Sequence, residues 1–270
     1  MRLVLAYRKV SYSSDPRYLE AMKQQLLFCK EHFSLSQPST IPSLQREKKL
    51  LSYLPKEISV TFDHASADFY FYVYPFLCAH KIPATVGVAW RYIPSNSTAD
   101  SLSITKRTSA PESLSFQDEI FSSLAPFCCP NELLQLAASP TITLASHGIG
   151  IRNLIRNPPY LLGEVILSKK NLEKLLQRSV SAFIYPFGRY DSLADKLVRQ
   201  HYETSFILGN TWNFSSKKHL VYRMEMRSVA DIEAFLSTKA HVSCLKNWIK
   251  AFALNSSKKF VGNPIKRFLR

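Results

Sequence analysis

The chain has 270 residues, of which 46% are hydrophobic and 20% charged, and its formal net charge is +15. This is an ordinary globular composition, long enough for one large α/β domain or two small ones, and it excludes a helical membrane span because no apolar run is long enough. The positive charge favours acidic partners, namely nucleic acid, anionic lipid or anionic glycan, although Lys and Arg spread over solvated faces would give the same sum.

Strand and helix patterns alternate from the N-terminus onward. The apolar run Leu3–Tyr7 is too short for the core of a signal peptide and predicts a first strand, which favours an intracellular protein. A polar stretch with Ser and Pro occupies 34–56. Around that stretch the pattern predicts a helix over Pro16–His32, a strand over Ile58–Phe62, a helix over Asp68–His80 and a strand over Ala84–Val88.

A long excursion at 91–127 interrupts the alternation; it is rich in Ser, Thr and Pro and lacks clear periodicity. Excursions of this length are usually functional or mobile, and whether this one covers a groove as a lid stays open. Beyond it, Asn131 and Asp191 are predicted N-caps, and Ser228 with Asp231 opens a last helix. The elements predicted there are helices over Glu132–Ala138, Gly163–Leu176 and 192–201, and strands over Ile142–Ala145, Ala182–Tyr185, Ser205–Leu208 and Leu220–Tyr222.

The repeated alternation implies parallel strands joined by right-handed crossovers. We therefore expect an α/β fold, a distorted (β/α) barrel of about seven parallel strands, in a single domain over 1–240. Only 241–270 looks separable, because it lacks acidic residues and combines lysines with an apolar stripe. The stripe consists of Leu245, Trp248, Ile249 and Phe252. This basic amphipathic tail predicts either contact with a membrane surface or a last helix packed on the domain.

The cysteines are odd in number and scattered, and none forms a CxxC pair. They are Cys29, Cys78, Cys128, Cys129 and Cys244. In a reducing compartment we expect free thiols that are mostly buried.

Three segments place chemically useful side chains directly after predicted strands. They are Ser-Val-Thr-Phe-Asp-His-Ala at 59–65, Thr-Leu-Ala-Ser-His-Gly at 143–148 and Phe-Ile-Tyr-Pro-Phe-Gly-Arg-Tyr-Asp at 183–191. The carboxyl ends of parallel strands meet at one edge of a sheet, where α/β enzymes build their sites. In this order and spacing the segments resemble the polysaccharide deacetylases, carbohydrate esterase family 4. The resemblance covers roughly residues 3–235 and implies that family's barrel and a divalent metal of the zinc type.

The first segment resembles the family motif Thr-Phe-Asp-Asp-Gly, whose first Asp is the general base and whose second Asp is a metal ligand. Asp63 takes the base position, where a carboxylate can accept a proton from water beside a metal. His64 replaces the ligand Asp, and imidazole also binds ions of the zinc type. Taken alone, Asp63 would be interpreted as a cap of the helix that follows its strand.

The second segment resembles the family's Ser-His motif, in which a second His follows four positions after the first. His147 matches the first of these ligands, but Ile151 stands at the second position and cannot bind a metal. Catalytic zinc sites usually have three protein ligands, so the matched set is one ligand short. If Asp63 serves as a ligand, it is less free to act as the base. For His147 alone, a structural histidine is the competing interpretation.

The third segment is the strongest match, and the family uses this turn to wall its substrate groove. The resemblance makes the Phe187 N–H a donor to the developing oxyanion, although a tight turn without catalysis would use the same Pro and Gly. It also implies a set of substrate-binding residues: Arg8, Tyr185, Pro186, Arg189 and Trp212.

The resemblance implies a metal-dependent hydrolase that acts on a carbon–nitrogen bond other than a peptide bond. It would remove an N-acetyl group from an amino sugar of a saccharide or glycolipid, with Asp63 as base and His64 and His147 on the metal. The altered positions leave an alternative open, namely a catalytically inactive relative that binds a glycan or anionic glycolipid, for which Arg8 suits a phosphate or carboxylate. Charge alone motivates a third interpretation, a nucleic-acid-associated protein, and no nucleic-acid motif accompanies it. We expect the protein in the cytoplasm, with peripheral contact at the inner membrane face through 241–270 as a further hypothesis.

Overall fold

The computed structural model describes residues 2–8, 16–37, 57–211, 213 and 219–236. In this part of the chain, eight strands form one sheet in the order β1-β8-β7-β6-β5-β4-β3-β2, and the parallel pairing of β1 with β3 closes seven of them into a barrel. The remaining strand, β2 (Ser34–Leu35), extends β3 outside the ring. The barrel strands are β1 (Arg2–Tyr7), β3 (Glu57–Phe62), β4 (Ala84–Val88), β5 (Ile142–Ser146), β6 (Ala182–Ile184), β7 (Thr204–Leu208) and β8 (Leu220–Glu225). The predicted (β/α) barrel of about seven parallel strands is confirmed.

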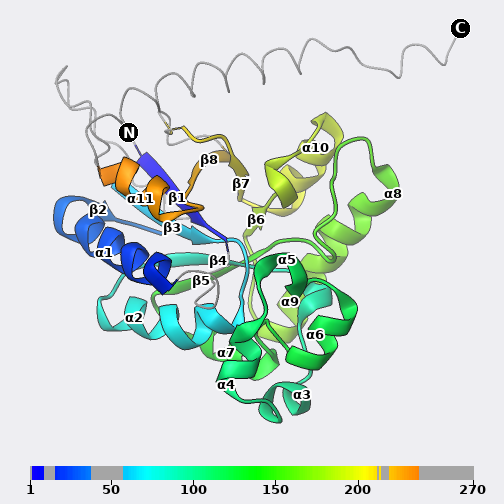
Figure 1. The fold of residues 1–270 in the computed structure, drawn as a ribbon. Helices are drawn as coiled ribbons and strands as arrows, with labels where there is room; N and C mark the ends of the chain where they lie inside the picture. The colour runs from blue at the N-terminus through cyan, green and yellow to red at the C-terminus, as the bar shows by residue number, and fades with distance from the viewer. Residues whose placement is uncertain (1, 9–15, 38–56, 212, 214–218, 237–270) are drawn as a thin grey trace, which may run out of the picture.

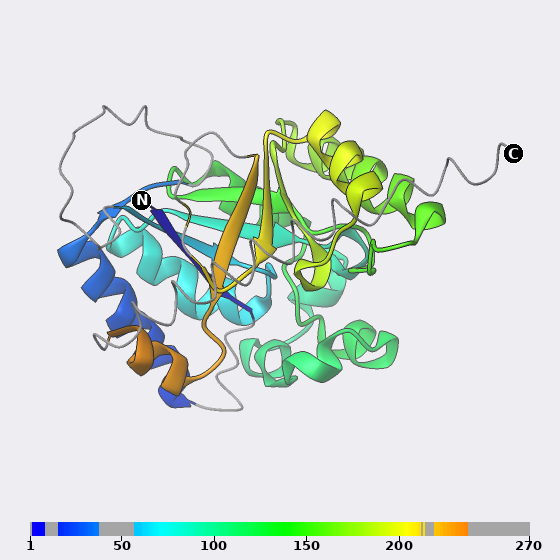
Figure 2. The ribbon, with the colours of Figure 1, turned by 90° about the horizontal axis from the view of Figure 1, so that it is seen from above.

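Both faces of the barrel strands are buried, which is why their sequences are nearly continuous apolar runs. Side chains alternate between the two faces. One set meets inside the barrel and consists of Val4, Ala145, Ala182, Ile184, Phe206 and Val221. The alternate set, such as Leu3, Leu5 and Phe183, packs with the helices in a larger outer core. Figure 2, a view from above, shows the strands in the middle with helices around them.

The surrounding helices follow the predicted order. Outside the excursion they are α1 (Pro16–His32), α2 (Tyr74–Ala79), α7 (Pro130–Ala138), α8 (Pro158–Leu161), α9 (Ser168–Leu176), α10 (Ser192–His201) and α11 (Val229–Leu236). The predicted bounds of α1 and α10 agree with the structure, and Asp191 caps α10 by accepting from two N–H groups. Two predicted helices instead contain a π-helical segment, at Phe69–Val73 and at Leu162–Leu167. Periodicity does not reveal such segments because they are short insertions of a wider turn.

The excursion at 91–127 is helical rather than irregular. It contains four short helices, α3 (Asn96–Asp100), α4 (Ile104–Ser109), α5 (Glu112–Ser115) and α6 (Asp118–Leu124), which lie together beside one end of the barrel (Figure 1). Ser95 and Ser103 cap α3 and α4 by accepting from the N–H groups of Thr98 and Lys106, at 3.1 and 3.3 Å. Each helix is shorter than the window over which helical periodicity becomes visible, so the pattern of apolar residues gave no helix here.

A buried ion pair fixes the excursion to the barrel. Arg107 donates two hydrogen bonds to Glu132, at 2.6 and 2.9 Å, and further bonds to two backbone carbonyls. The same Glu132 carboxylate accepts from the N–H of Cys129 at 2.9 Å and so caps α7. The predicted cap, Asn131, lies inside the first turn of α7, because Pro130 already begins the helix. Its N–H donates to Asn96 of the excursion at 3.1 Å.

The cysteine prediction is confirmed within the described ranges. Cys29, Cys128 and Cys129 are buried free thiols, and Cys78 is a partly exposed free thiol, whereas Cys244 lies outside the described residues. None of the helices in the described ranges is long and apolar enough to cross a membrane. The predicted tail at 241–270 also lies outside the described residues, so the domain boundary at residue 240 stays a prediction.

Candidate active site

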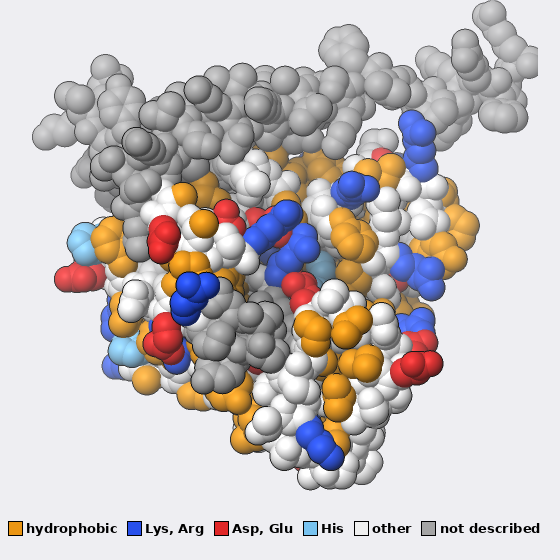
Figure 3. All heavy atoms as spheres, in the orientation of Figure 1, with side chains coloured by type: hydrophobic (Ala, Val, Ile, Leu, Met, Phe, Trp, Pro, Cys, Tyr) orange, Lys and Arg blue, Asp and Glu red, His pale blue; other side chains and the backbone are white. Residues whose placement is uncertain are grey.

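A pocket of about 450 Å³ opens at the carboxyl ends of the barrel strands. Its lining comes partly from residues that follow strands and partly from the excursion. The lining residues are Arg8, Asp63, His64, Tyr92, Glu112, Ser113, Phe116, His147, Gly150, Ile151, Phe187 and Leu208. Figure 3 shows basic and acidic side chains gathered in the middle of the corresponding face. The strand-end residues Asp63, His64 and His147 therefore share one pocket, as their spacing predicts.

Asp63 faces the pocket and forms an ion pair with Arg223 of β8. Arg223 is fully buried at 0% exposure and also donates to the hydroxyl of Thr61 at 3.2 Å. The helix that follows β3 is capped by a different carboxylate, Asp68, which accepts from the Phe69 N–H at 2.9 Å. The interpretation of Asp63 as a helix cap is therefore wrong, because Asp68 fills that role.

Two opposing effects set the ionisation of Asp63. Burial by itself raises the pKa of this carboxyl group, but the positive charge of Arg223 and the neighbouring His147 and His64 lower it further than burial raises it. The net pKa of Asp63 lies below its ordinary value. Asp63 is therefore a carboxylate at neutral pH and is able to accept a proton.

His147 is buried, and one of its nitrogens is held by the backbone. Its Nδ1 lies 2.9 Å from the carbonyl oxygen of Ile184, and because a carbonyl only accepts, Nδ1 carries the proton. Burial, followed by the nearby His64, lowers the pKa of His147 to about 3. The ring is therefore neutral at pH 7, and Nε2 keeps its lone pair. This is the protonation state in which an imidazole binds a metal.

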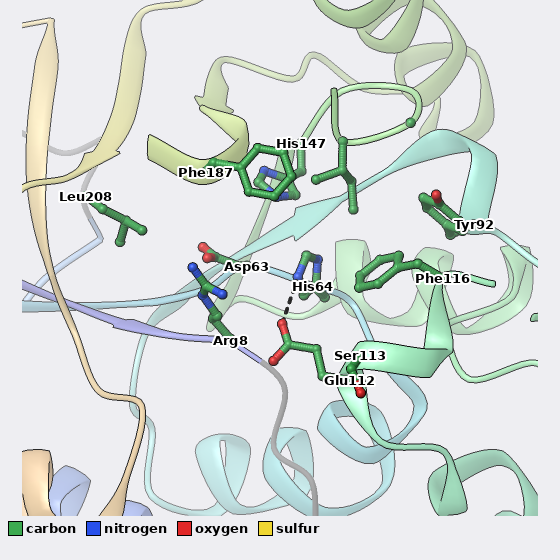
Figure 4. A pocket seen from close by; sticks show the side chains of 12 residues that line it. Arg8, Asp63, His64, Tyr92, Glu112, Ser113, Phe116, His147, Phe187 and Leu208 are labelled. Carbon is green, nitrogen blue, oxygen red and sulfur yellow. Dashed lines mark ion pairs between the residues drawn. The ribbon is translucent and has the colours of Figure 1, made fainter. Parts of the chain in front are cut away.

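His64 lies between His147 and Glu112 (Figure 4). The ring centroids of the two histidines are 5.2 Å apart, and Nε2 of His64 is 3.5 Å from Oε1 of Glu112. The edge of the His64 ring also contacts Phe116, with centroids 5.0 Å apart. The predicted set did not include Glu112 or Phe116. Both belong to the excursion, where no strand end or recognised motif marks them.

The two histidines fit a divalent metal, and the third position that the resemblance implies does not. Two imidazoles on one tetrahedral ion place their ring centroids roughly 5 Å apart, close to the spacing of His64 and His147. Ile151 instead contributes an apolar side chain to the pocket wall. Among the described residues, no group of three or more His, Cys, Asp or Glu side chains is arranged to hold a metal ion as it stands. The residues at the family positions therefore supply two of the three protein ligands that a catalytic zinc site usually has.

A buried carboxylate shapes the loop that follows His147. Glu164 accepts the N–H groups of Ile149 and Gly150, each at 2.9 Å. Gly148 has a φ of +87°, and a Cβ there would lie 2.1 Å from the Glu164 carboxylate, so only glycine fits. The loop leaves Ile151 with a φ of +55°, a conformation that β-branched residues rarely adopt.

The predicted substrate-binding residues differ in whether they line the pocket. Arg8 lines the pocket, and its Nε lies 2.6 Å from Oε1 of Glu225. Tyr185 and Pro186 are buried and Arg189 is exposed, and none of the three lines the pocket. Trp212 lies outside the described residues. Their substrate-binding roles stay predictions.

Phe187 does line the pocket, with 56% of its surface exposed. It sits in the turn after β6 with a φ of +57°. No hydrogen bond within the described part of the chain engages its N–H. Phe187 is one of several apolar or aromatic side chains in the pocket lining, with Tyr92, Phe116, Ile151 and Leu208. The pocket thus combines a proton acceptor with room for a neutral, partly apolar group.

The sequence matches the family model described as polysaccharide deacetylase over residues 52–204. Several solved structures share the fold. They include the Streptococcus pyogenes deacetylase PplD in complex with acetate (17% identity, TM-score 0.61, 87% of this chain and 95% of that one). They also include a de-N-acetylase from Aggregatibacter actinomycetemcomitans (16%, 0.62, 87% and 99%). A third is IcaB from Ammonifex degensii (16%, 0.62, 87% and 96%). No curated protein matches the sequence.

Proposed function

The chain belongs to the polysaccharide deacetylase family, and we propose that it is a hydrolase that removes an N-acetyl group from an amino sugar of a saccharide or glycolipid. The observation that carries the proposal is Asp63. It occupies the base position of the family motif, faces the pocket and is kept ionised by Arg223. A buried carboxylate of this kind is costly unless it is paired, and here the pairing leaves it beside two imidazoles.

The substrate class is supported by the shape of the pocket and by the similar structures. Two of these are a deacetylase and a de-N-acetylase by name, and one of them binds acetate, the product of such a reaction. The apolar side chains in the pocket lining suit the methyl group of an acetamide. The exposed ring of Phe187 at the pocket edge suits the apolar face of a sugar ring.

In the proposed reaction, Asp63 accepts a proton from the water that attacks the acetyl carbonyl. When the carbon–nitrogen bond then breaks, the proton passes to the leaving nitrogen, so that acetate and the free amino sugar are released. Arg223 holds that carboxylate in position and ionised. The N–H of Phe187 donates to the carbonyl oxygen as negative charge develops on it. Neutral His147 and its neighbour His64 would hold a divalent metal of the zinc type, which supplies Lewis acidity for the carbonyl group when it is bound.

The alternative, a relative that binds a glycan or an anionic glycolipid without hydrolysis, is less well supported. A pocket used for binding alone has no need of a desolvated carboxylate. Asp63 nevertheless keeps both its position and its charge. Ile151 motivates the alternative, and an intact Asp63 argues against it.

Acetate release from a panel of N-acetylated glucosamine oligosaccharides tests the proposal with metal-reconstituted protein. Asp63→Asn is expected to lower the rate by about 10²–10⁴-fold, the usual contribution of a general base. Asp100→Asn, which makes the same change at an exposed position of α3, is the matched control. Circular dichroism establishes that both variants are folded. Full activity of a folded Asp63→Asn variant would contradict the proposed mechanism.

A further inference from the structure

We propose that a surface beside the pocket, here called the rim surface, binds an anionic lipid bilayer. It is built from the loop after β5, from α8 and from the start of α10 with the turn that precedes it. Its members are exposed apolar or aromatic side chains and exposed arginines. The first kind are Tyr160, Leu162, Phe187 and Leu193, and the second are Arg152, Arg156 and Arg189. The inference concerns binding alone and does not depend on hydrolysis.

The apolar part of the rim surface is concentrated in α8 and the residue after it. Pro158, Pro159, Tyr160 and Leu162 are exposed, whereas Leu161 among them is buried and anchors the segment. Leu162 is 64% exposed, more than any other large hydrophobic residue in the described ranges. A single exposed leucine is ordinary, but neighbouring exposed apolar side chains mark an interaction site.

Contacts between the segments bring the loop, α8 and α10 together. The guanidinium of Arg152 lies 4.3 Å from the ring centroid of Tyr160. The N–H of Arg156 donates to Oδ2 of Asp191 at 2.8 Å, and Oδ1 of Asp191 accepts the N–H of Leu193 at 3.1 Å. α8 also contacts α10 directly. Segments separated in the sequence therefore form one continuous surface.

The rim surface borders the pocket. Phe187 belongs to both, and Ile151, which precedes Arg152 in the chain, also lines the pocket. Figure 3 shows hydrophobic side chains at the edge of the molecule where Figure 1 places α8, with Lys and Arg side chains beside them. A partner bound to the rim surface would therefore lie next to the pocket opening.

The charge of the rim surface is positive. Arg152, Arg156 and Arg189 are exposed, and within the described ranges none of them forms a salt bridge. The nearby acidic residues are engaged by backbone groups. Glu164 is buried and accepts two N–H groups of the loop, and Asp191 accepts the N–H groups of Arg156 and the first turn of α10. The surface therefore complements an anionic partner.

The combination of side chains favours a bilayer over an anionic polymer. A nucleic acid or an acidic glycan would pair with the arginines and stack on the aromatic rings, but it offers no apolar environment to Leu162 and Leu193. The outer layer of a membrane offers both kinds of contact, because phosphate groups lie directly above acyl chains. Tyr160 suits the boundary between them, since its ring is apolar and its hydroxyl is polar.

Vesicle binding by the full chain tests the apolar contribution. Co-sedimentation is measured with vesicles of phosphatidylcholine alone and of phosphatidylcholine mixed with phosphatidylglycerol, and the wild type is expected to bind the mixed vesicles more tightly. Tyr160→Ser/Leu162→Ser is expected to weaken that binding at least about 10-fold, because two side chains no longer enter the bilayer. Ile104→Ser/Leu134→Ser removes two comparably exposed apolar side chains from α4 and α7 and is the matched control.

A second pair of variants tests the electrostatic contribution. Arg152→Gln/Arg156→Gln is expected to lower the affinity for the mixed vesicles about 10-fold or more, and to leave binding to phosphatidylcholine alone unchanged. High salt is expected to reduce the difference from the wild type. Lys170→Gln/Lys174→Gln removes the same charge from exposed positions of α9 and is expected to bind like the wild type.

The inference is overturned if the wild type does not bind the mixed vesicles. It is equally overturned if both rim-surface variants bind them with the affinity of the wild type, which would place membrane binding elsewhere in the chain. Acetate release from a soluble N-acetylated oligosaccharide is measured on Tyr160→Ser/Leu162→Ser in parallel. Unchanged release with weakened vesicle binding is the expected result, and a failure of hydrolysis in the wild type leaves the vesicle result standing.

Discussion

At the scale of single residues, the pair of Asp63 and Arg223 decides the electrostatics of the pocket. The two side chains come from β8 and from the residue after β3, and both are almost fully buried. Replacing one member of a buried pair leaves the other charge uncompensated, which usually costs about 3–5 kcal/mol. We therefore expect Arg223→Met to lower the free energy of unfolding by about that amount. Arg199→Met, which breaks the exposed pair with Asp195, is expected to cost at most about 1 kcal/mol.

The cost of Arg223→Met depends on pH. In the wild type, the pKa of Asp63 is lower in the folded state than in the unfolded state. The ion pair therefore contributes its full stability above about pH 4, and this contribution is lost as the pH falls through the pKa of the folded state. In the variant, the charge and hydrogen bond of Arg223 no longer lower the pKa of Asp63, so this pKa is higher than in the wild type. The difference in unfolding free energy between the two proteins is therefore expected to shrink as the pH falls, and urea titrations over a pH series measure it. A pH-independent difference would show that Arg223 stabilises the fold by packing alone.

At the scale of elements, the backbone of the loop after β5 is held in a conformation that does not suit the isoleucine at position 151. Ile151 is held at a φ of +55° by a loop that Glu164 anchors. The left-handed conformation costs an ordinary residue about 1–2 kcal/mol, and glycine avoids that cost. We expect Ile151→Gly to be less destabilising than Ile149→Gly by about 1–2 kcal/mol, since both remove an isoleucine of intermediate exposure. Thermal unfolding of the two variants checks this, and equal destabilisation would contradict the strain.

The elements also show where sequence reasoning succeeds. Buried parallel strands and long helices have strong local patterns, so β1, β4, α1 and α10 were predictable to within a residue or so. The helices α3–α6 were not predictable, because each is too short to show a period and Arg107 and Glu132 hold them by contacts distant in sequence. The π-helical segments escaped for a related reason, since packing rather than composition selects the wider turn.

The residues of the site also differ in whether the sequence alone predicts them. Asp63, His64 and His147 could be predicted because they follow strands, and parallel strands bring their ends together. Glu112 could not, because it reaches His64 only through the folded excursion. Tyr185 and Pro186 match the family motif at the level of sequence, yet their side chains lie in the core. A motif therefore located the turn correctly without specifying which of its side chains meet the pocket.

At the scale of the whole molecule, barrel closure creates the site. Asp63 and Arg223 are 160 positions apart, and they meet because β1 pairs with both β3 and β8. The excursion then adds Glu112 to the pocket lining, beside His64 (Figure 4). The net charge of +15 is a property of the whole sequence, whereas the charged groups around the pocket are largely paired with one another. The charge excess therefore says little about the chemistry of this pocket.

The proposed hydrolysis requires that the altered pocket still binds a metal. The most direct test is the elemental metal content of the purified, reconstituted protein beside that of a His64→Ala/His147→Ala double variant. We expect about one zinc, cobalt or nickel ion per chain in the wild type and its loss in the double variant. No metal in either protein, or equal metal in both, would contradict this expectation and leave the chain to be studied as a glycan-binding member of the family.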